Sequence, residues 1–245
     1  ALMRAASNGY KEIVELLIEN GANIRYRSNG GDTILMDAAY NGHSEIIEIL
    51  IAEGAQVNSK NDDGDTALMI AARRGFPQAI ETLIEEGANL NSENYNDKTA
   101  LMEAVTEKNS DVVKVLLENN VDINKAIDIA KENDNEEIVN LFEEHYYQQA
   151  DDLAGYNRYL EEYPSGKYAA EVKRKKEQYY YKRAKEDKYY NQYLEKYPEG
   201  KYVTEIRKLK EKYYYQQADD IEGYNEYLEE YPSGRYAVEI KKKRE

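Results

Sequence analysis

The 245-residue sequence contains no cysteine and no tryptophan, and it has only four prolines, two phenylalanines and two histidines. The lack of cysteine excludes disulfides and thiolate metal sites. No apolar run approaches the ~18 residues that a membrane-spanning helix needs. A hydrophobic content of 41% beside 33% charged residues is nevertheless enough to form a core in water.

Charge and tyrosine are distributed unevenly along the chain, whose formal net charge is −15. Residues 146–245 contain 21 basic and 20 acidic residues, a net charge of +1, and 21 of the 25 tyrosines. Residues 1–145 contain the other 12 basic and 28 acidic residues, a net charge of −16. Two regions of different chemistry therefore meet near residue 145, and the acidic one should repel nucleic acid and anionic membranes.

A 33-residue period runs through the first region, as in "TILMDAAYNG", "TALMIAARRG" and "TALMEAVTEK". Each period predicts two short helices: one over "TxLMxAA", and a second over segments such as "SEIIEILIAEG", where apolar residues recur at helical spacing. Leu68 is expected in the core. The predicted closing residues of the first helices are Gly9, Gly42 and Gly75, and the predicted left-handed ends of the second helices are Gly21, Gly54, Gly87 and Asn120.

The combination of G-x-T-x-L, A-A-x-x-G and G-A-x-[VIL]-N at a fixed 33-residue period resembles the ankyrin repeat over roughly residues 1–142. The segment "NKAIDIAKENDNEEIVNLFEE" is similar to a shortened closing repeat that covers the end of such a stack. The opening "ALMRAASNGY" resembles the middle of a repeat, so we expect the chain to be a fragment of a longer one.

A second period, of 34 residues, follows in "YNRYLEEYPSGKY", "YNQYLEKYPEGKY" and "YNEYLEEYPSGRY". Pro164, Pro198 and Pro232 should each end a helix, because proline lacks the N–H group and restricts the preceding residue. The stretch from Lys167 to about Ala184 has no helix breaker and predicts one long helix.

Shorter helices should end at each proline, with Asp187 and the Asp219–Asp220 pair as N-caps. Long and short helices joined by a "YPxG" corner resemble tetratricopeptide-type hairpins, in the version found in bacterial outer-membrane assembly lipoproteins.

The triplet "YYY" at 179–181 spans too wide an arc around its helix to lie on one apolar stripe. It should therefore pack against two neighbours, with the first two rings towards one and the third towards the other.

No glycine or proline occurs between Ile138 and Gly155, so one helix is predicted to lead from the first region into the second. The predicted fold class is all-α: an elongated α-solenoid in which an ankyrin stack continues into a tetratricopeptide-like array. The predicted domains are residues 1–145, with an incomplete first repeat and a shortened cap, and residues 146–245, with three tyrosine-rich repeats.

Signs of catalysis or metal binding are few. The sequence has no G-x-x-x-x-G-K-[ST], G-x-G-x-x-G or G-x-S-x-G motif, and its two histidines lack partners at zinc-ligand spacing. The "NDDGD" segment at 61–65 suggests calcium but lacks the rest of the EF-hand spacing. We therefore expect no enzyme activity, no catalytic residue, no metal, no cofactor and no small-molecule substrate.

The ankyrin resemblance implies a non-catalytic scaffold that binds a protein partner through its finger tips and the concave face of its first helices. Tyr40, Arg73 and Arg74 are the expected anchors, since aromatics and arginines dominate binding hot spots. Replacing both arginines by alanine should weaken partner binding without changing thermal melting. The predicted partner-binding residues are Arg27, Asn29, Asp32, Tyr40, Asn41, Lys60, Asp62, Asp65, Arg73, Arg74, Glu93, Tyr95, Lys98, Thr106 and Glu107.

The acidity of the chain favours a partner with a basic patch. Two alternatives stay open: a regulatory or targeting arm of a larger enzyme or toxin, and single-stranded nucleic-acid binding by basic–aromatic runs such as "KRKKEQYYYKR". The near-neutral charge of the second region argues against nucleic acid. The absence of cysteine fits any compartment. A cytoplasmic location is slightly favoured, with a periplasmic or surface location as the alternative if a leader was removed.

Overall fold

The computed structural model describes residues 1–119 and 121–245, so the predicted turn at Asn120 lies outside the described residues. Within these two ranges the chain is all-α, with sixteen helices and no strand beyond an isolated antiparallel bridge between Arg27 and Thr33. None of the described helices is both long enough and apolar enough to cross a membrane. The chain divides into unit 1, Ala1–His145, and unit 2, Tyr146–Glu245.

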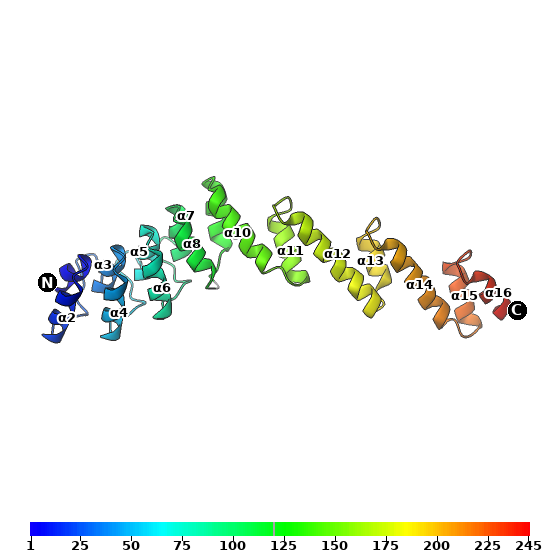
Figure 1. Cartoon of the computed structure of the whole chain (residues 1–245), viewed down its shortest axis with the longest axis horizontal. Coiled ribbons are helices and arrows are strands. Elements are labelled where there is room, and N and C mark those ends of the chain that lie inside the picture. The colour runs from blue at the N-terminus through cyan, green and yellow to red at the C-terminus, as the bar shows by residue number, and fades with distance from the viewer. Residues whose placement is uncertain (120) are drawn as a thin grey trace. The chain divides into compact units, whose positions relative to one another are not determined.

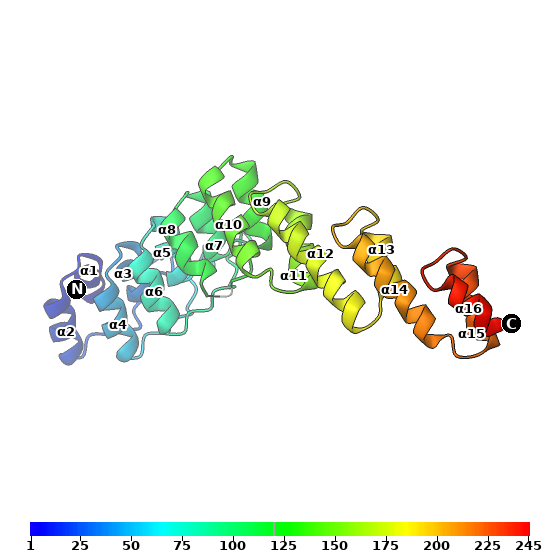
Figure 2. The ribbon, with the colours of Figure 1, turned by 45° about the vertical axis from the view of Figure 1, so that its right-hand side comes forward.

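Unit 1 consists of helix pairs stacked in chain order (Figures 1 and 2). The first helices of the pairs pack against one another in one row, and the second helices pack in another. The first helices are α1 (Leu2–Ser7), α3 (Ile34–Tyr40), α5 (Ala67–Arg74), α7 (Ala100–Thr106) and α9 (Asn124–Glu132), and the second helices are α2 (Lys11–Glu19), α4 (Ser44–Ala52), α6 (Pro77–Glu85) and α8 (Ser110–Leu117).

The repeated threonine starts three of the first helices of unit 1, α3, α5 and α7. The hydroxyls of Thr33, Thr66 and Thr99 accept hydrogen bonds from the backbone N–H three residues on, at 3.2, 3.3 and 3.3 Å. Each hydroxyl thereby satisfies one of the free N–H groups at its helix start. The leucine at the second position of these helices, such as Leu35 or Leu68, is buried. The predicted register of the repeat is therefore confirmed.

The glycines predicted to close the helices all have left-handed backbone conformations. The φ values lie between 73° and 95° at Gly9, Gly21, Gly42, Gly54, Gly75 and Gly87. Lys108 occupies the position that follows Gly75 by one period and has φ 60°. The repeat geometry is therefore kept where the sequence lacks glycine.

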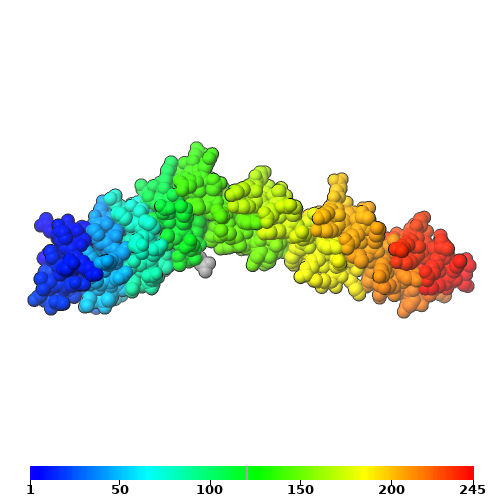
Figure 3. Space-filling view, in the orientation of Figure 1, coloured from blue at the N-terminus to red at the C-terminus, as the bar shows by residue number. Residues whose placement is uncertain are grey.

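Helix α10 (Glu136–Gln148) begins in unit 1 and includes the first residues of unit 2. It extends through the predicted junction but stops at Gln148, short of Gly155. The remaining helices of unit 2 pack in chain order, as the successive colour bands of this unit show in Figure 3. They are α11 (Leu153–Glu162), α12 (Ala169–Glu186), α13 (Tyr190–Lys196), α14 (Val203–Gln217), α15 (Ile221–Glu230) and α16 (Ala237–Arg244).

The long helix predicted over 167–184 is α12, displaced by two residues at each end. Of the predicted N-caps, Asp220 is confirmed: its carboxylate accepts a hydrogen bond from the Gly223 amide at 2.8 Å. Asp187 is not an N-cap. It follows the last residue of α12, and α13 begins only at Tyr190.

The wrong N-cap prediction at Asp187 is explained by a tyrosine in the middle repeat at a position where the other two repeats have glycine. Gly155 lies so close to the preceding turn that a Cβ atom there would come within 2.8 Å of the Ala150 Cα. Gly223 occupies the same position in the third repeat, whereas the middle repeat has Tyr189. The tight corner is therefore not available in the middle repeat. Helix α12 continues to Glu186, and α13 has 7 residues where α11 and α15 each have 10.

The second and third rings of the tyrosine triplet pack on the following helix pair, α13 and α14. Tyr180 meets Tyr197 edge to face at 5.6 Å between ring centroids, and Tyr181 stacks on Tyr202 at 4.0 Å. Tyr179 contacts Tyr180 at 5.8 Å. The second ring faces the end of α13 and the third faces the start of α14. Both rings pack against the same apolar cluster, so the prediction that they face two different neighbours is wrong for these two rings.

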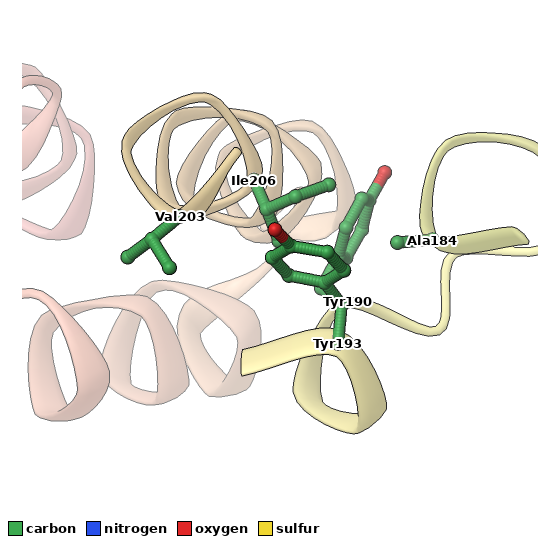
Figure 4. Packing of buried hydrophobic residues seen from close by; sticks show 5 residues of the cluster. All are labelled: Ala184, Tyr190, Tyr193, Val203 and Ile206. Atoms are coloured by element: carbon green, nitrogen blue, oxygen red, sulfur yellow. The ribbon is translucent and has the colours of Figure 1, made fainter. Parts of the chain in front are cut away.

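One fully buried tyrosine stands at the centre of each repeat of unit 2. Figure 4 shows Tyr193 among Tyr190, Val203, Ile206 and Ala184. Its hydroxyl accepts a hydrogen bond from the Tyr202 amide at 3.1 Å and donates one to Glu177 at 2.6 Å. The ring fills the core while both hydrogen-bonding capacities of the hydroxyl are used, which makes burial of the polar group favourable.

The stacking register of unit 1 predicts the effect of Leu68→Ala. Leu68 is 1% exposed, so removing its side chain should lower the free energy of unfolding by ~2–5 kcal/mol through lost burial and the remaining cavity. Urea denaturation measures the difference. Leu16→Ala is the matched control, because Leu16 is 57% exposed and its loss should change stability by only about 0.5 kcal/mol. Equal effects of the two substitutions would contradict the register.

The buried phenols of unit 2 predict a loss of stability at alkaline pH. Burial raises the pKa of Tyr197 to about 12, and burial together with the Glu211 hydrogen bond raises the pKa of Tyr227 to about 12. An unfolded tyrosine titrates near ~10, so the stabilisation is complete below that pH and is lost as the pH rises from about 10 to 12.

Circular dichroism across this pH range measures that loss. Tyr197→Phe keeps the ring and removes the ionisable group, so this variant should lose less helix between pH 10 and 12 than the unsubstituted chain. An identical pH dependence of the two proteins would show that Tyr197 does not contribute to alkaline unfolding.

Candidate functional site

Three loops of unit 1, here called fingers, join α2 to α3, α4 to α5 and α6 to α7. They are residues 20–33, 53–66 and 86–99. Backbone hydrogen bonds tie neighbouring fingers together: the Asp62 amide donates to the Gly30 carbonyl, and the Tyr95 amide donates to the Asp63 carbonyl, both at 3.1 Å. The approach is close, since a Cβ atom on Gly64 would lie 2.8 Å from the Tyr95 nitrogen. The fingers therefore form one connected edge of the unit.

Three predicted binding residues at one repeat position connect these fingers. The Arg27 guanidinium donates to the carbonyl of Lys60 at 2.7 Å, and the Lys60 ammonium donates to the carbonyl of Glu93 at 2.7 Å. Glu93 forms an ion pair with Lys125 at 2.9 Å. The charged ends of all three side chains are thus engaged within the unit.

A second set of contacts links each finger to the next through an asparagine. The side-chain amide of Asn61 donates to Asp32 at 2.8 Å, and that of Asn94 donates to Asp65 at 2.7 Å. Sequence reasoning missed both asparagines. They stand 33 residues apart, each four positions before a predicted binding residue, and this spacing was the available signal.

The expected anchor Arg73 is half-buried, and two buried carboxylates engage its side chain. Its guanidinium donates to Asp65 at 2.7 Å and to both carboxylate oxygens of Glu103 at 3.0 and 3.2 Å. Asp65 is 4% exposed and Glu103 is 5% exposed. The hydrogen bonds with Glu103 are the main cause of the raised pKa of Arg73. The sequence analysis missed Glu103, an acidic residue on an otherwise apolar face of α7.

Arg74 and Tyr40 form an exposed pair on the first-helix side of the unit. The Arg74 guanidinium carbon lies 4.5 Å from the centroid of the Tyr40 ring, within the range of a cation–π contact. Tyr40 is 48% exposed, and Tyr95 at the tip of the third finger is 71% exposed. These three large side chains are therefore accessible for contact with another molecule.

A cavity of about 200 Å³, here called the acidic recess, lies beside Tyr40. Asp37 in this recess is half-buried, and burial together with the charge of Asp32 raises the pKa of its carboxyl above the usual value. The recess is lined by Asp32, Met36, Asp37, Tyr40, Asn61, Asp63, Asp65, Ile70 and Arg73.

The other predicted binding residues differ in their surroundings. The Asn41 amide donates to Ser7 at 3.1 Å and to the Asp37 carbonyl at 2.9 Å, and the Thr106 hydroxyl donates to the Met102 carbonyl at 2.7 Å. Lys98 is half-buried. Asn29, Asp62 and Glu107 are exposed.

In the described ranges, 1–119 and 121–245, no three histidine or acidic side chains are grouped so that they could hold a metal ion. The "NDDGD" segment instead forms the second finger, in which the Asn61 side chain accepts hydrogen bonds from the amides of Asp63 and Asp65 at 3.1 and 2.8 Å. His43 contacts the Ser7 carbonyl at 3.1 Å through Nε2.

The family model "Ankyrin repeats (3 copies)" matches residues 1–61 and 35–127, which together cover just over half of the chain. The chain belongs to the ankyrin-repeat family. Ankyrin repeats are typically non-catalytic modules of protein interaction. A comparison with curated proteins found no match.

The two adjacent arginines of this ankyrin unit should differ in their effect on stability. Arg73→Ala removes the cation between two buried carboxylates, and we expect it to lower the free energy of unfolding by ~1–3 kcal/mol. Arg74→Ala removes an exposed cation–π contact and should cost less than about 1 kcal/mol. Chemical denaturation of both variants tests this difference, and unchanged stability of the Arg73 variant would contradict the assigned role of its ion pairs.

Proposed function

We propose that this protein is a non-catalytic scaffold whose ankyrin unit binds a protein partner through the finger surface, defined as the finger tips and the outward sides of α3, α5 and α7. The observation that supports this most directly is the exposed Tyr40–Arg74 pair beside the acidic recess, with Tyr95 exposed on the third finger. Rigid aromatic rings and arginines supply much of the binding energy in protein interfaces. Tyr40, Arg74 and Tyr95 are therefore the proposed anchors.

The charge of the ankyrin region supports a partner with a basic patch. Residues 1–145 have a net charge of −16, and three carboxylates of the recess, those of Asp32, Asp37 and Asp63, add local negative charge. A complementary positive surface would be attracted at long range and oriented during encounter.

The tyrosine-rich residues 146–245 are proposed as a second domain, an array of three tetratricopeptide-like repeats. Helix pairs that recur every 34 residues around the buried tyrosines support this interpretation. Nucleic-acid stacking is not favoured, because one face of the last tyrosine ring of each consecutive run is already occupied. The stacked ring pairs, with the distances between their centroids, are Tyr147–Tyr168 at 4.1 Å, Tyr181–Tyr202 at 4.0 Å and Tyr215–Tyr236 at 4.2 Å.

If the chain is instead an arm of a larger enzyme, that arm would use the same finger surface. The full reading frame would identify such an enzyme.

The experiment begins with affinity capture of the partner from the source cell and its identification by mass spectrometry. The purified partner is then titrated calorimetrically against the unsubstituted chain, Tyr40→Ala and Arg74→Ala. Each substitution should weaken binding by ~1–2 kcal/mol, or roughly 5- to 30-fold.

Glu48→Ala is the matched control for these titrations, since Glu48 is exposed on α4, in the row of second helices. It should bind like the unsubstituted chain. Unchanged affinity of both anchor variants, at unchanged melting temperature, would show that the partner binds elsewhere.

A further inference from the structure

A cavity of about 210 Å³ in unit 2, here called the tyrosine pocket, lies between the start of α13 and the helix α14. It is lined by residues 188–192 and by Lys210, Tyr213 and Tyr214 of α14. Such a volume can hold a small ligand group, since one water takes up about 30 Å³. Among residues 1–119 and 121–245, no acidic side chain lines the pocket. Its walls therefore consist of aromatic rings, side-chain amides and cations.

The pocket lies where the middle repeat departs from the other two. Residue 187 is one period after the start of α11 and one period before the start of α15, but α13 begins only at Tyr190. Lys188 therefore stands in a loop beside the pocket. Its equivalents in the other repeats are Ala154 and Glu222, so the middle repeat alone has a cation at this position.

Tyr190 contributes a buried hydroxyl that the fold does not use. Its ring belongs to the apolar cluster of Figure 4 and is 8% exposed, and within residues 1–119 and 121–245 its hydroxyl forms no hydrogen bond. In the first repeat, by contrast, the equivalent Tyr156 hydroxyl donates to the Asp151 carbonyl at 3.2 Å. Burial, together with the nearby Tyr213, raises the pKa of Tyr190, so the hydroxyl keeps its proton. It is therefore a donor for which a ligand can supply the acceptor.

Lys188 supplies the charge of the pocket. Its ammonium lies 4.7 Å from the centroid of the Tyr213 ring, and the Tyr190 ring lies 5.9 Å from the same ring. In the part of the chain that the structure describes, Lys188 forms no ion pair. Lys210, the other cation of the pocket, is paired with Glu230 at 2.6 Å. One positive charge is therefore left for a ligand, beside the donor of Tyr190.

We propose that the tyrosine pocket binds a carboxylate on a short aliphatic stem, with hydrogen bonds from the Lys188 ammonium and the Tyr190 hydroxyl and with the stem against the rings. The glutamate side chain of a protein and small organic acids share this chemistry. A hydrogen bond to an ionised group is stronger than one between neutral groups. A carboxylate is preferred to a phosphate monoester, because the latter carries up to two negative charges and the pocket offers one free cation.

Small probes test the proposal. N-acetyl-glutamate methylamide, its neutral glutamine counterpart and butyrate are titrated into the isotope-labelled chain, and the backbone amide signals of residues 188–192 are followed by NMR. The glutamate probe should bind at least about fivefold more tightly than the glutamine probe, because only a carboxylate gains from the cation. Both carboxylate sources support the proposal: equal binding of butyrate indicates a free organic acid, and weaker binding of butyrate indicates a peptide side chain.

Lys188→Gly removes the ammonium with little effect on the backbone. Lys188 has φ 60°, a left-handed conformation that glycine adopts readily. This variant should weaken binding of the glutamate probe by about three- to tenfold. Lys108→Gly is the matched control, since Lys108 also has φ 60° but belongs to unit 1 and does not line the pocket. It should bind the probe like the unsubstituted chain.

Tyr190→Phe keeps the buried ring and removes the hydroxyl. It should also weaken binding of the glutamate probe by about three- to tenfold, at an unchanged melting temperature, because the hydroxyl has no partner among the described residues. Tyr224→Phe, at the same position of the third repeat, is the control and should not change binding. A lower melting temperature of Tyr190→Phe would show that the fold itself uses this hydroxyl and would contradict its assignment to a ligand.

Equal binding of the glutamate and glutamine probes, or unchanged binding by either pocket variant, would overturn this inference. Tighter binding of inorganic phosphate than of both carboxylate probes would equally overturn the assignment to a carboxylate. The tyrosine pocket shares no residue with the finger surface, so its failure would leave the proposed function as it stands.

Discussion

Burial of apolar side chains between neighbouring repeats is the interaction on which both units depend. In unit 1, Leu35, Leu68 and Leu101 are almost fully enclosed between successive first helices. A helix pair with a neighbour on one side only leaves apolar side chains exposed, as α2 illustrates: Ile13 is 47% exposed, whereas Ile46, one period later, is 2% exposed. Order in each repeat therefore depends on its neighbour, which is the property that defines solenoid repeats.

The tyrosine-rich unit obeys the same constraint with a different side chain. Tyr159, Tyr193 and Tyr227 are completely enclosed, although each contains a polar hydroxyl. Their hydroxyls accept hydrogen bonds from the backbone N–H groups of the "YPxG" corners, at 3.0, 3.1 and 3.1 Å. One residue type thus fills the core and also fixes where the following helix begins, which explains why tyrosine recurs every 34 residues.

Much of the fold could be predicted from periodicity alone. The threonine starts, the glycine ends and the buried leucines of unit 1 all follow from repetition, because a residue that recurs at each period has the same environment in each repeat. The N-cap at Asp187 could not be predicted, since the local sequence gives no sign that Tyr189 excludes the tight corner formed at Gly155 and Gly223.

The candidate surface was harder to predict than the fold. The sequence predicts the same binding role for Arg73 and Arg74. Only their three-dimensional contacts show that the surroundings of the two side chains differ. Arg73 meets Asp65 from a finger and Glu103 from the next first helix, α7, residues 8 and 30 positions away in the chain. Charges that lie far apart in sequence decide whether an arginine is structural or available to a partner, and a one-dimensional pattern does not contain that information.

The tips of the fingers are joined by bonds between main-chain groups, such as that from the Tyr95 amide to the Asp63 carbonyl, and a glycine stands at the point of closest approach. A main-chain bond does not depend on which side chain projects from the same residue. Outward-facing positions such as Asp62 and Tyr95 can therefore be exchanged with little loss of scaffold stability. A change of binding specificity in this protein would require substitutions at a few tips, without compensating changes in the stack beneath them.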